Sequence, residues 1–346
     1  MRTETALHVQ AVLDRYPIEA PTVEGRDEVG IMNDNWLVTE SSGSRYMLHA
    51  YQRVRDSGRI AFQLALQEHL HAAGFPTAPI VPTRSGEPFA VVEGVHWTLS
   101  GFVEGTEYDF ASRAQATEAG RRLAQFETLA AGYRGRVVEP STAPVNDGKW
   151  LAPVSSHVWR SSMLSGEHEA RLRELYAGRG LDDELRYFGE WRRGTAIEWP
   201  RQRLEGLPQA WLHCDYHGRN MVFQDDELTG LFDFDFVAHG PRTFDLARGV
   251  FNFGREQRVS ATLREDFCRA FLQGFESELP LTDEERHALP MMAVLNWAPD
   301  AAFALARERE PGDRGPDFHL RFGVGMMRAI DAEMRRLAPA LGWPAS

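Results

Sequence analysis

The hydrophobic pattern of this chain changes near residue 105, and that change limits the folds that the chain can adopt. Before it, the runs NWLVTE (35–40) and RYMLHAY (45–51) flank the turn residues SSGS and predict a β-hairpin. An amphipathic helix is predicted over 57–74 and ends at Gly74. After residue 105 long helical patterns dominate, and 346 residues are too many for one small core. We therefore expect an α+β protein with two parts.

The boundary between the parts is predicted near GFVEGT, residues 101–106. It gives a small β-rich part over 1–103 and a larger, mostly helical part over 104–346. Within the second part, the spacing of apolar residues predicts helices over 111–132, 167–206, 256–280, 283–310 and 321–337.

Charge and cysteine content exclude several classes of protein. The formal net charge of −12 disfavours binding to nucleic acid or to an anionic membrane. It would favour a cationic small substrate, although an acidic surface more often serves solubility alone. Two cysteines, Cys214 and Cys268, do not make a disulfide framework. Because no stretch resembles a signal peptide or the ~18 apolar residues of a membrane span, we expect a cytoplasmic protein.

The densest group of reactive side chains lies in HCDYHGRN, residues 213–220. Taken alone, this stretch allows a metal cluster, a nucleophile with its base, or a loop that directs one carboxylate. A zinc site needs more soft ligands, and no second Cys/His pair at zinc-like spacing occurs elsewhere. Cys214 is disfavoured as a nucleophile, because its side chain is expected to point away from Asp215. We therefore prefer the loop that directs a carboxylate.

The segment LFDFDF, residues 231–236, alternates acidic and aromatic residues. As a strand it would place Asp233 and Asp235 on one face. Two adjacent carboxylates disfavour each other's ionisation, and Mg²⁺ or a basic partner would resolve this conflict. A half-exposed edge strand with its polar residues outward is the plain alternative.

The spacing between the two segments favours phosphoryl transfer. His213, Asp215 two residues later, Asn220 and then Asp233 match the catalytic-loop pattern of kinase-type enzymes. In that pattern the loop Asp orients the attacking hydroxyl and accepts its proton. The Asn and the second Asp hold Mg²⁺ against the nucleotide phosphates.

The motif HCDYHGRN followed by GLFDFDFVAHGPRTFDLA resembles the aminoglycoside phosphotransferase and choline kinase-like superfamily. The style is closest to its homoserine kinase-like and antibiotic kinase members, and a weaker likeness spans most of residues 30–250. The resemblance implies a bilobal protein-kinase-like fold that binds ATP or GTP with Mg²⁺ in the cleft. It also implies the following roles: Asp215 as catalytic base, Asn220 and Asp233 as metal ligands, and His213, His217 and Asp245 as structural support of the loop. Asp235, two residues after Asp233, is a further candidate for acceptor binding or for a second metal.

The nucleotide side departs from the family pattern. Where the family has Lys or Arg at the end of the second hairpin strand, this chain has His49. Gln63 falls near the helix glutamate that normally pairs with that basic residue. A neutral His–Gln pair is chemically coherent, because losing one charge alone would leave the other unpaired. A shifted register in which Arg45 or Arg53 serves instead, or loss of activity, are the alternatives.

Three further residues belong to the predicted nucleotide site. Asn35 is expected over the phosphates together with His49. The backbone around Ser100 and Phe102 is expected to meet the purine ring, because WTLSGFVEG lies where the two lobes join.

We therefore predict a monomeric or homodimeric kinase that transfers the γ-phosphoryl group of ATP or GTP to a hydroxyl of a small molecule. An antibiotic, either an aminoglycoside or another sugar- or nucleoside-containing natural product, is the first choice of acceptor by fold-level analogy. A metabolic kinase of homoserine, a methylthio-sugar or an amino alcohol is the alternative. An inactive nucleotide-binding protein, favoured by His49, and transfer to a protein side chain are the remaining hypotheses.

Overall fold

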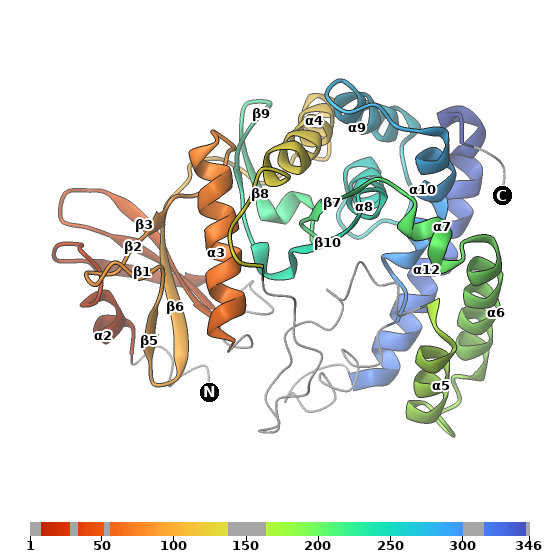
Figure 1. The fold of residues 1–346 in the computed structure, drawn as a ribbon, viewed down its shortest axis with the longest axis horizontal. Helices are drawn as coiled ribbons and strands as arrows, with labels where there is room; N and C mark the ends of the chain where they lie inside the picture. The colour runs from red at the N-terminus through yellow and green to blue at the C-terminus, as the bar shows by residue number, and fades with distance from the viewer. Residues whose placement is uncertain (1–7, 28–33, 52–55, 138–163, 300–314, 344–346) are drawn as a thin grey trace.

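The structure is a computed structural model that describes residues 8–27, 34–51, 56–137, 164–299 and 315–343. Figure 1 shows a strand-rich N-terminal lobe beside a larger helical C-terminal lobe. The expected α+β fold with these two lobes is confirmed. The predicted boundary at residue 103 falls between the last strand of the N-terminal sheet and the first long helix of the C-terminal lobe.

One antiparallel sheet forms the N-terminal lobe in the order β1-β2-β3-β6-β4, with β5 paired to β6. Its strands are β1 (Thr22–Asp27), β2 (Asp34–Thr39), β3 (Arg45–Tyr51), β4 (Ile80–Val81), β5 (Ala90–Val92) and β6 (Val95–Gly101). The predicted hairpin is confirmed, because β2 and β3 pair directly. In this register His49 lies opposite Asn35 on β2 and opposite Thr98 on β6. The short helix α2 (Val9–Leu13) packs against the same lobe.

Helix α3 (Ser57–Ala72) lies between the two lobes (Figure 1), and the helix predicted there is confirmed. Its N-cap Asp56 accepts hydrogen bonds from two backbone N–H groups of the first turn. Gly74, with a φ of 82°, follows its end. Ile60 and Leu64 pack on the sheet side, whereas the opposite side of the helix joins the core of the C-terminal lobe. This helix therefore packs against both lobes.

The C-terminal lobe is built from helices around two short antiparallel strand pairs. The helices are α4 (Arg113–Ala130), α5 (Gly166–Leu175), α6 (Asp182–Glu198), α7 (Arg201–Glu205), α8 (Thr243–Gly254), α9 (Glu265–Glu276), α10 (Asp283–Leu295) and α12 (Gly315–Leu341). The strands are β7 (Gln209–Leu212), which pairs with β10 (Ala238–Pro241), and β8 (Met221–Gln224), which pairs with β9 (Glu227–Leu231). Two 3-10 turns, η3 (Gly218–Asn220) and η4 (Phe234–Phe236), follow β7 and β9 along the chain.

Helices α4 and α9 pack at unusually close range because glycines lie at their contact. A Cβ atom on Gly120 would lie 1.9 Å from the carbonyl oxygen of Phe271, and one on Gly274 would lie 1.9 Å from that of Thr117. Only glycine permits such an approach of two backbones. The contact fixes α4, whose Ala119 carbonyl accepts a hydrogen bond from the loop that contains Asp215.

Some predicted helix boundaries differ from the structure. The range 167–206, predicted as helical, is divided into α5, α6 and α7, and two glycines with left-handed φ values separate the first two. Helix α9 begins at Glu265 rather than at residue 256, and α10 ends at Leu295. The prediction over 300–310 lies outside the described residues. Within the described ranges, no helix combines the length and the apolar content that a bilayer crossing requires.

Candidate active site

The loop from His213 to His217 rests on the first turn of α8. Asp245 is fully buried in that turn and accepts hydrogen bonds from the backbone N–H groups of His213 and Cys214, the latter at 3.0 Å. Burial raises the pKa of Asp245 to about 6, and the two N–H groups oppose that shift by favouring the carboxylate. Two turns further along α8, Asn252 donates to the carbonyl of Tyr216 at 3.0 Å. Side chains of helix α8 thus hold the loop by hydrogen bonds to the backbone of the loop.

His213 ties the loop to the acidic segment. Its ring is fully buried, with Nε2 at 2.8 Å from the carbonyl oxygen of Phe232 and Nδ1 at 3.3 Å from the backbone nitrogen of Asp215. A carbonyl can only accept and an N–H can only donate, so the proton belongs on Nε2. Burial lowers the pKa of His213 to about 4, which keeps the ring neutral at pH 7. This neutral ring fixes Asp215 relative to the residue before Asp233.

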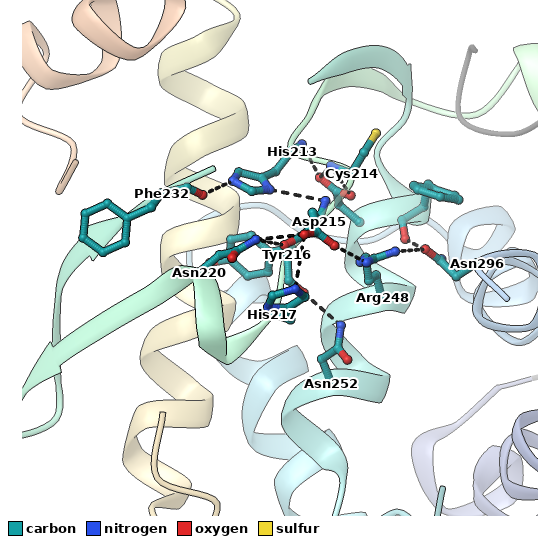
Figure 2. A network of polar contacts seen from close by, with 12 residues as sticks. His213, Cys214, Asp215, Tyr216, His217, Asn220, Phe232, Arg248, Asn252 and Asn296 are labelled. Atoms are coloured by element: carbon teal, nitrogen blue, oxygen red, sulfur yellow. Dashed lines mark hydrogen bonds and ion pairs between the residues drawn. The ribbon is translucent and has the colours of Figure 1, made fainter. Parts of the chain in front are cut away.

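Three side chains converge on the carboxylate of Asp215 (Figure 2). Asn220 Nδ2 donates to Oδ2 at 2.9 Å, and His217 Nε2 lies 3.2 Å from the same oxygen. Arg248 forms an ion pair with Oδ1. Burial alone would raise the pKa of Asp215, but the charge of Arg248 and then the contact with His217 hold it well below its usual range. Asp215 is therefore an ionised carboxylate in a fixed orientation.

Sequence reasoning missed Arg248, although a signal for it was present. Arg248 follows Asp245 by three residues, so the two side chains lie on the same face of α8. Since Asp245 faces the loop, Arg248 faces it as well. Its Nη1 also donates to Asn296 Oδ1 at 3.3 Å, and this second residue comes from the end of α10, far away in the sequence.

The acidic segment is not a strand. Strand β9 ends at Leu231, Asp233 has left-handed backbone angles (φ 61°, ψ 68°), and the 3-10 turn η4 follows it. The prediction that Asp233 and Asp235 share one face of a strand is therefore wrong, because the left-handed residue breaks the alternation. The predicted electrostatic conflict is nevertheless present. Burial, and then the negative charges of Asp235 and Asp215, raise the pKa of Asp233 well above its usual range.

Two side chains of α3 reach the backbone of this acidic segment. Gln63 Nε2 donates to the carbonyl oxygen of Asp235 at 2.7 Å. Arg59, which is 2% exposed, donates to the carbonyls of Asp235 and Val237. Asp235, predicted as an acceptor-binding or second-metal residue, is itself buried. Sequence reasoning did not identify Arg59, because its partners are backbone atoms more than 170 residues away.

The donor set near Asp215 fits a magnesium ion. Asn220 Nδ2 donates both to the carbonyl oxygen (3.0 Å) and to the carboxylate of Asp215, which leaves its side-chain oxygen as a ligand atom. Asp233 Oδ1 is buried and has no hydrogen-bond partner among the described residues. An unsatisfied buried carboxylate oxygen and an available amide oxygen are ligands that suit a hard cation, which completes its shell with water and phosphate. Among the described residues, no three His, Cys, Asp or Glu side chains gather into a metal site.

The predicted neutral pair of His49 and Gln63 does not form as a hydrogen bond. His49 Nδ1 lies 2.7 Å from Asn35 Oδ1, whereas His49 Nε2 and Gln63 Oε1 are both buried without a partner among the described residues. Burial lowers the pKa of His49 although Asp235 opposes the shift, so the ring is neutral. Asn35 and His49 thus form one polar unit on neighbouring strands.

The alternatives for the basic position differ in their surroundings. Arg45 forms an ion pair with Glu104 and lies over the ring of Phe102, with 4.1 Å between the guanidinium carbon and the ring centroid. Arg53 lies outside the described residues. Ser100 lies in β6 opposite Met47, and the backbone N–H of Phe102 donates to the carbonyl of Arg45 at 3.0 Å.

Cys214 is buried, and Figure 2 shows its sulfur directed away from the Asp215 carboxylate. Its φ of 61° is a left-handed value that side chains other than glycine rarely adopt. The left-handed conformation lets the backbone N–H of Cys214 reach Asp245 while Asp215 turns toward Asn220. The residue therefore contributes its backbone rather than its thiol.

Comparison with known proteins supplies the context for this geometry. The profile of the phosphotransferase enzyme family matches residues 26–281. A homoserine kinase from Caulobacter vibrioides is 26% identical over 321 residues, covering 89% of this chain and 92% of that protein. An amicoumacin kinase in complex with AMP-PNP and Ca²⁺ has a TM-score of 0.64 at 13% identity, with 95% of this chain and 93% of that one covered. An aminoglycoside phosphotransferase from Alicyclobacillus acidocaldarius has a TM-score of 0.60 at 17% identity and covers 96% of both chains.

Proposed function

The chain belongs to the phosphotransferase enzyme family and is a small-molecule kinase with an alcohol acceptor, and from this premise we propose that Asp215 is its catalytic base. The suspected superfamily and the kinase-like bilobal fold are confirmed. The observation that carries the proposal is the carboxylate of Asp215, which Asn220, His217 and Arg248 hold in one orientation. The unsatisfied carboxylate oxygen of Asp233 belongs to the same electrostatic cluster.

The proposed reaction is an in-line transfer of the γ-phosphoryl group. An oxygen lone pair of the acceptor hydroxyl forms a bond to the γ-phosphorus. The bond from that phosphorus to the β,γ-bridging oxygen breaks, and the nucleoside diphosphate leaves with the electron pair. The hydroxyl proton passes to Asp215. His213 and Asp245 hold the loop, and hence Asp215, in place during the step.

The nucleotide and its cation occupy the cleft between the lobes in this proposal. Asn220 and Asp233 would hold Mg²⁺, which when bound neutralises charge on the transferred phosphate. Asn35 and the unpartnered Nε2 of His49 would contact the phosphates, and the backbone near Ser100 and Phe102 would meet the purine. Because His49 is neutral, it would contact the phosphates as a hydrogen-bonding group and not as a positive charge. Measurement decides between ATP and GTP.

Two acceptor classes have different support. An antibiotic acceptor rests on analogy with solved structures whose sequences are under 20% identical, and such likeness supports a fold rather than a substrate. A homoserine-like metabolic acceptor has the support of several homoserine kinases that match at 26–28% identity over most of the chain. Asp235 stays a proposed acceptor-side or second-metal residue in either case.

The test is transfer of phosphate from ATP and from GTP with Mg²⁺ across antibiotics, amino acids with a hydroxyl, sugars and amino alcohols. Wild type is compared with Asp215→Ala and with Asp183→Ala, an exposed carboxylate on α6. Product that falls at least about 100-fold in Asp215→Ala, but not in Asp183→Ala, supports the proposed base. Equal transfer by all three proteins refutes it. Nucleotide binding without transfer to any acceptor indicates the inactive nucleotide-binding alternative.

A further inference from the structure

We propose that Arg248 recognises the acceptor, and that this acceptor is a hydroxy compound with a carboxylate close to the hydroxyl that receives the phosphoryl group. The inference rests on the proposed function, because it names the class of the second substrate. It starts from the guanidinium that touches the proposed base (Figure 2).

The position of Arg248 is set by two helices. Helix α8 presents it to the loop, and Asn296 holds it from the end of α10. Asn296 is buried, and its Nδ2 donates to the carbonyls of Phe244 (3.1 Å) and Met292 (2.9 Å). With both amide hydrogens used, the side-chain oxygen of Asn296 must face Arg248. A long flexible side chain is thereby fixed beside the place where the acceptor hydroxyl must lie.

Arg248 has more donors than the protein satisfies. A guanidinium carries five N–H groups, and the described contacts use Nη1 with Asn296 and Nη2 with Asp215. Nε is shielded from solvent and has no partner among the described residues. The side chain still has 20% of its surface exposed. The remaining donors suit a planar anion such as a carboxylate, which guanidinium binds with two parallel hydrogen bonds.

Further positive charge lies beyond Arg248. Burial, and then the charges of Arg248 and Arg258, lower the pKa of Arg255 to about 10. Arg255 Nε has no partner among the described residues, and Arg258 is 3.9 Å from its acidic neighbour Glu107. Arg255 is half-buried and Arg258 is exposed, so this positive charge borders the solvent near Arg248. A net charge of −12 for the whole chain therefore does not describe the field near Asp215.

Two simpler roles for Arg248 make different predictions. If it only braced Asp215, or only contacted the transferred phosphoryl group, its loss would slow transfer to every acceptor alike. Recognition of an acceptor carboxylate instead makes the loss depend on that carboxylate. The ratio of kcat/KM for an acid to that for its amide removes any effect on Asp215, because Asp215 acts on both compounds.

The experiment compares matched acceptors that differ only in charge: homoserine with homoserine amide, and 4-hydroxybutanoate with 4-hydroxybutanamide. The proteins are wild type, Arg248→Gln, Arg248→Lys and the control Arg201→Gln, an exposed arginine on α7. Wild type and control should prefer the acid by about 10- to 100-fold in kcat/KM, and Arg248→Gln should lose that preference. Arg248→Lys should keep part of it, because the charge remains without the planar donors. Thermal shifts by each compound without nucleotide give a binding readout that does not need turnover.

The outcomes separate this inference from the proposed function. Transfer that depends on Asp215 but shows no preference for the acid, or a preference that persists in Arg248→Gln, overturns the inference and leaves the proposed function intact. Selective phosphorylation of acceptors that lack a carboxylate does the same. Absence of all transfer refutes the proposed function. In that case stabilisation by the acids but not the amides, lost in Arg248→Gln, still supports an anion site, and equal shifts overturn it.

Discussion

His213 makes the stability of this protein depend on pH in a direction that its burial determines. The folded state holds the pKa of His213 at about 4, below its ordinary value of 6.5, because the ring is buried and its Nδ1 accepts an N–H. Below pH 6.5 the unfolded chain gains a proton at this residue, whereas the folded chain does not. The stabilisation is thus complete above pH 6.5 and is lost as pH falls toward about 4.

The magnitude follows from the shift. A difference of about 2.5 pKa units corresponds to about 3 kcal/mol of unfolding free energy, at 1.36 kcal/mol per unit. The assay is urea unfolding of wild type and His213→Gln at several pH values from 7.5 to 4.5, with the exposed His239→Gln as control. The difference in unfolding free energy between wild type and His213→Gln should shrink by about 2–3 kcal/mol over this range.

The comparison isolates one residue, because every other titrating group is common to the variants. Asp245, whose pKa is raised to about 6, acts in the opposite direction over part of the range but cancels in the difference. Parallel curves for wild type and His213→Gln would refute the reasoning. They would mean that His213 is protonated in the folded protein or that its surroundings are hydrated.

Three further predictions concern the site. Arg248→Gln removes the charge that keeps the pKa of Asp215 low, so the acidic limb of the kcat/KM profile should move to higher pH; an unmoved limb would contradict Asp215 as the base. Cys214→Gly should keep kcat within about threefold, because glycine adopts the φ of 61° readily and the sulfur points away from Asp215; loss of activity would implicate the thiol. Asp233→Asn should raise the melting temperature in Mg²⁺-free buffer by about 2 °C or more, since a neutral amide removes a buried repelling carboxyl, and should abolish transfer; calorimetry that shows a lower melting temperature would exclude this repulsion.

Local sequence patterns predicted much of the fold. The hairpin over β2 and β3, and helix α3, were predictable because alternation, apolar spacing and a terminal glycine act within a few residues of each other. Helix boundaries over 167–206 and before Glu265 were not, since glycines with left-handed φ and contacts between distant segments interrupt an otherwise helical composition.

The sequence by itself determined the chemistry of this protein. The order and spacing of His213, Asp215, Asn220 and Asp233 indicate phosphoryl transfer. Asp215 and Asn220 lie within one short loop, so their contact depends on no distant segment. The tertiary structure alone decided which charges surround that loop. Arg248 meets Asp215 because α8 packs beneath the loop, and Asn296 orients Arg248 only because α10 packs against α8. Side-chain contacts between distant elements, and the left-handed turn at Asp233, leave no period in the sequence, so only the packed molecule reveals them.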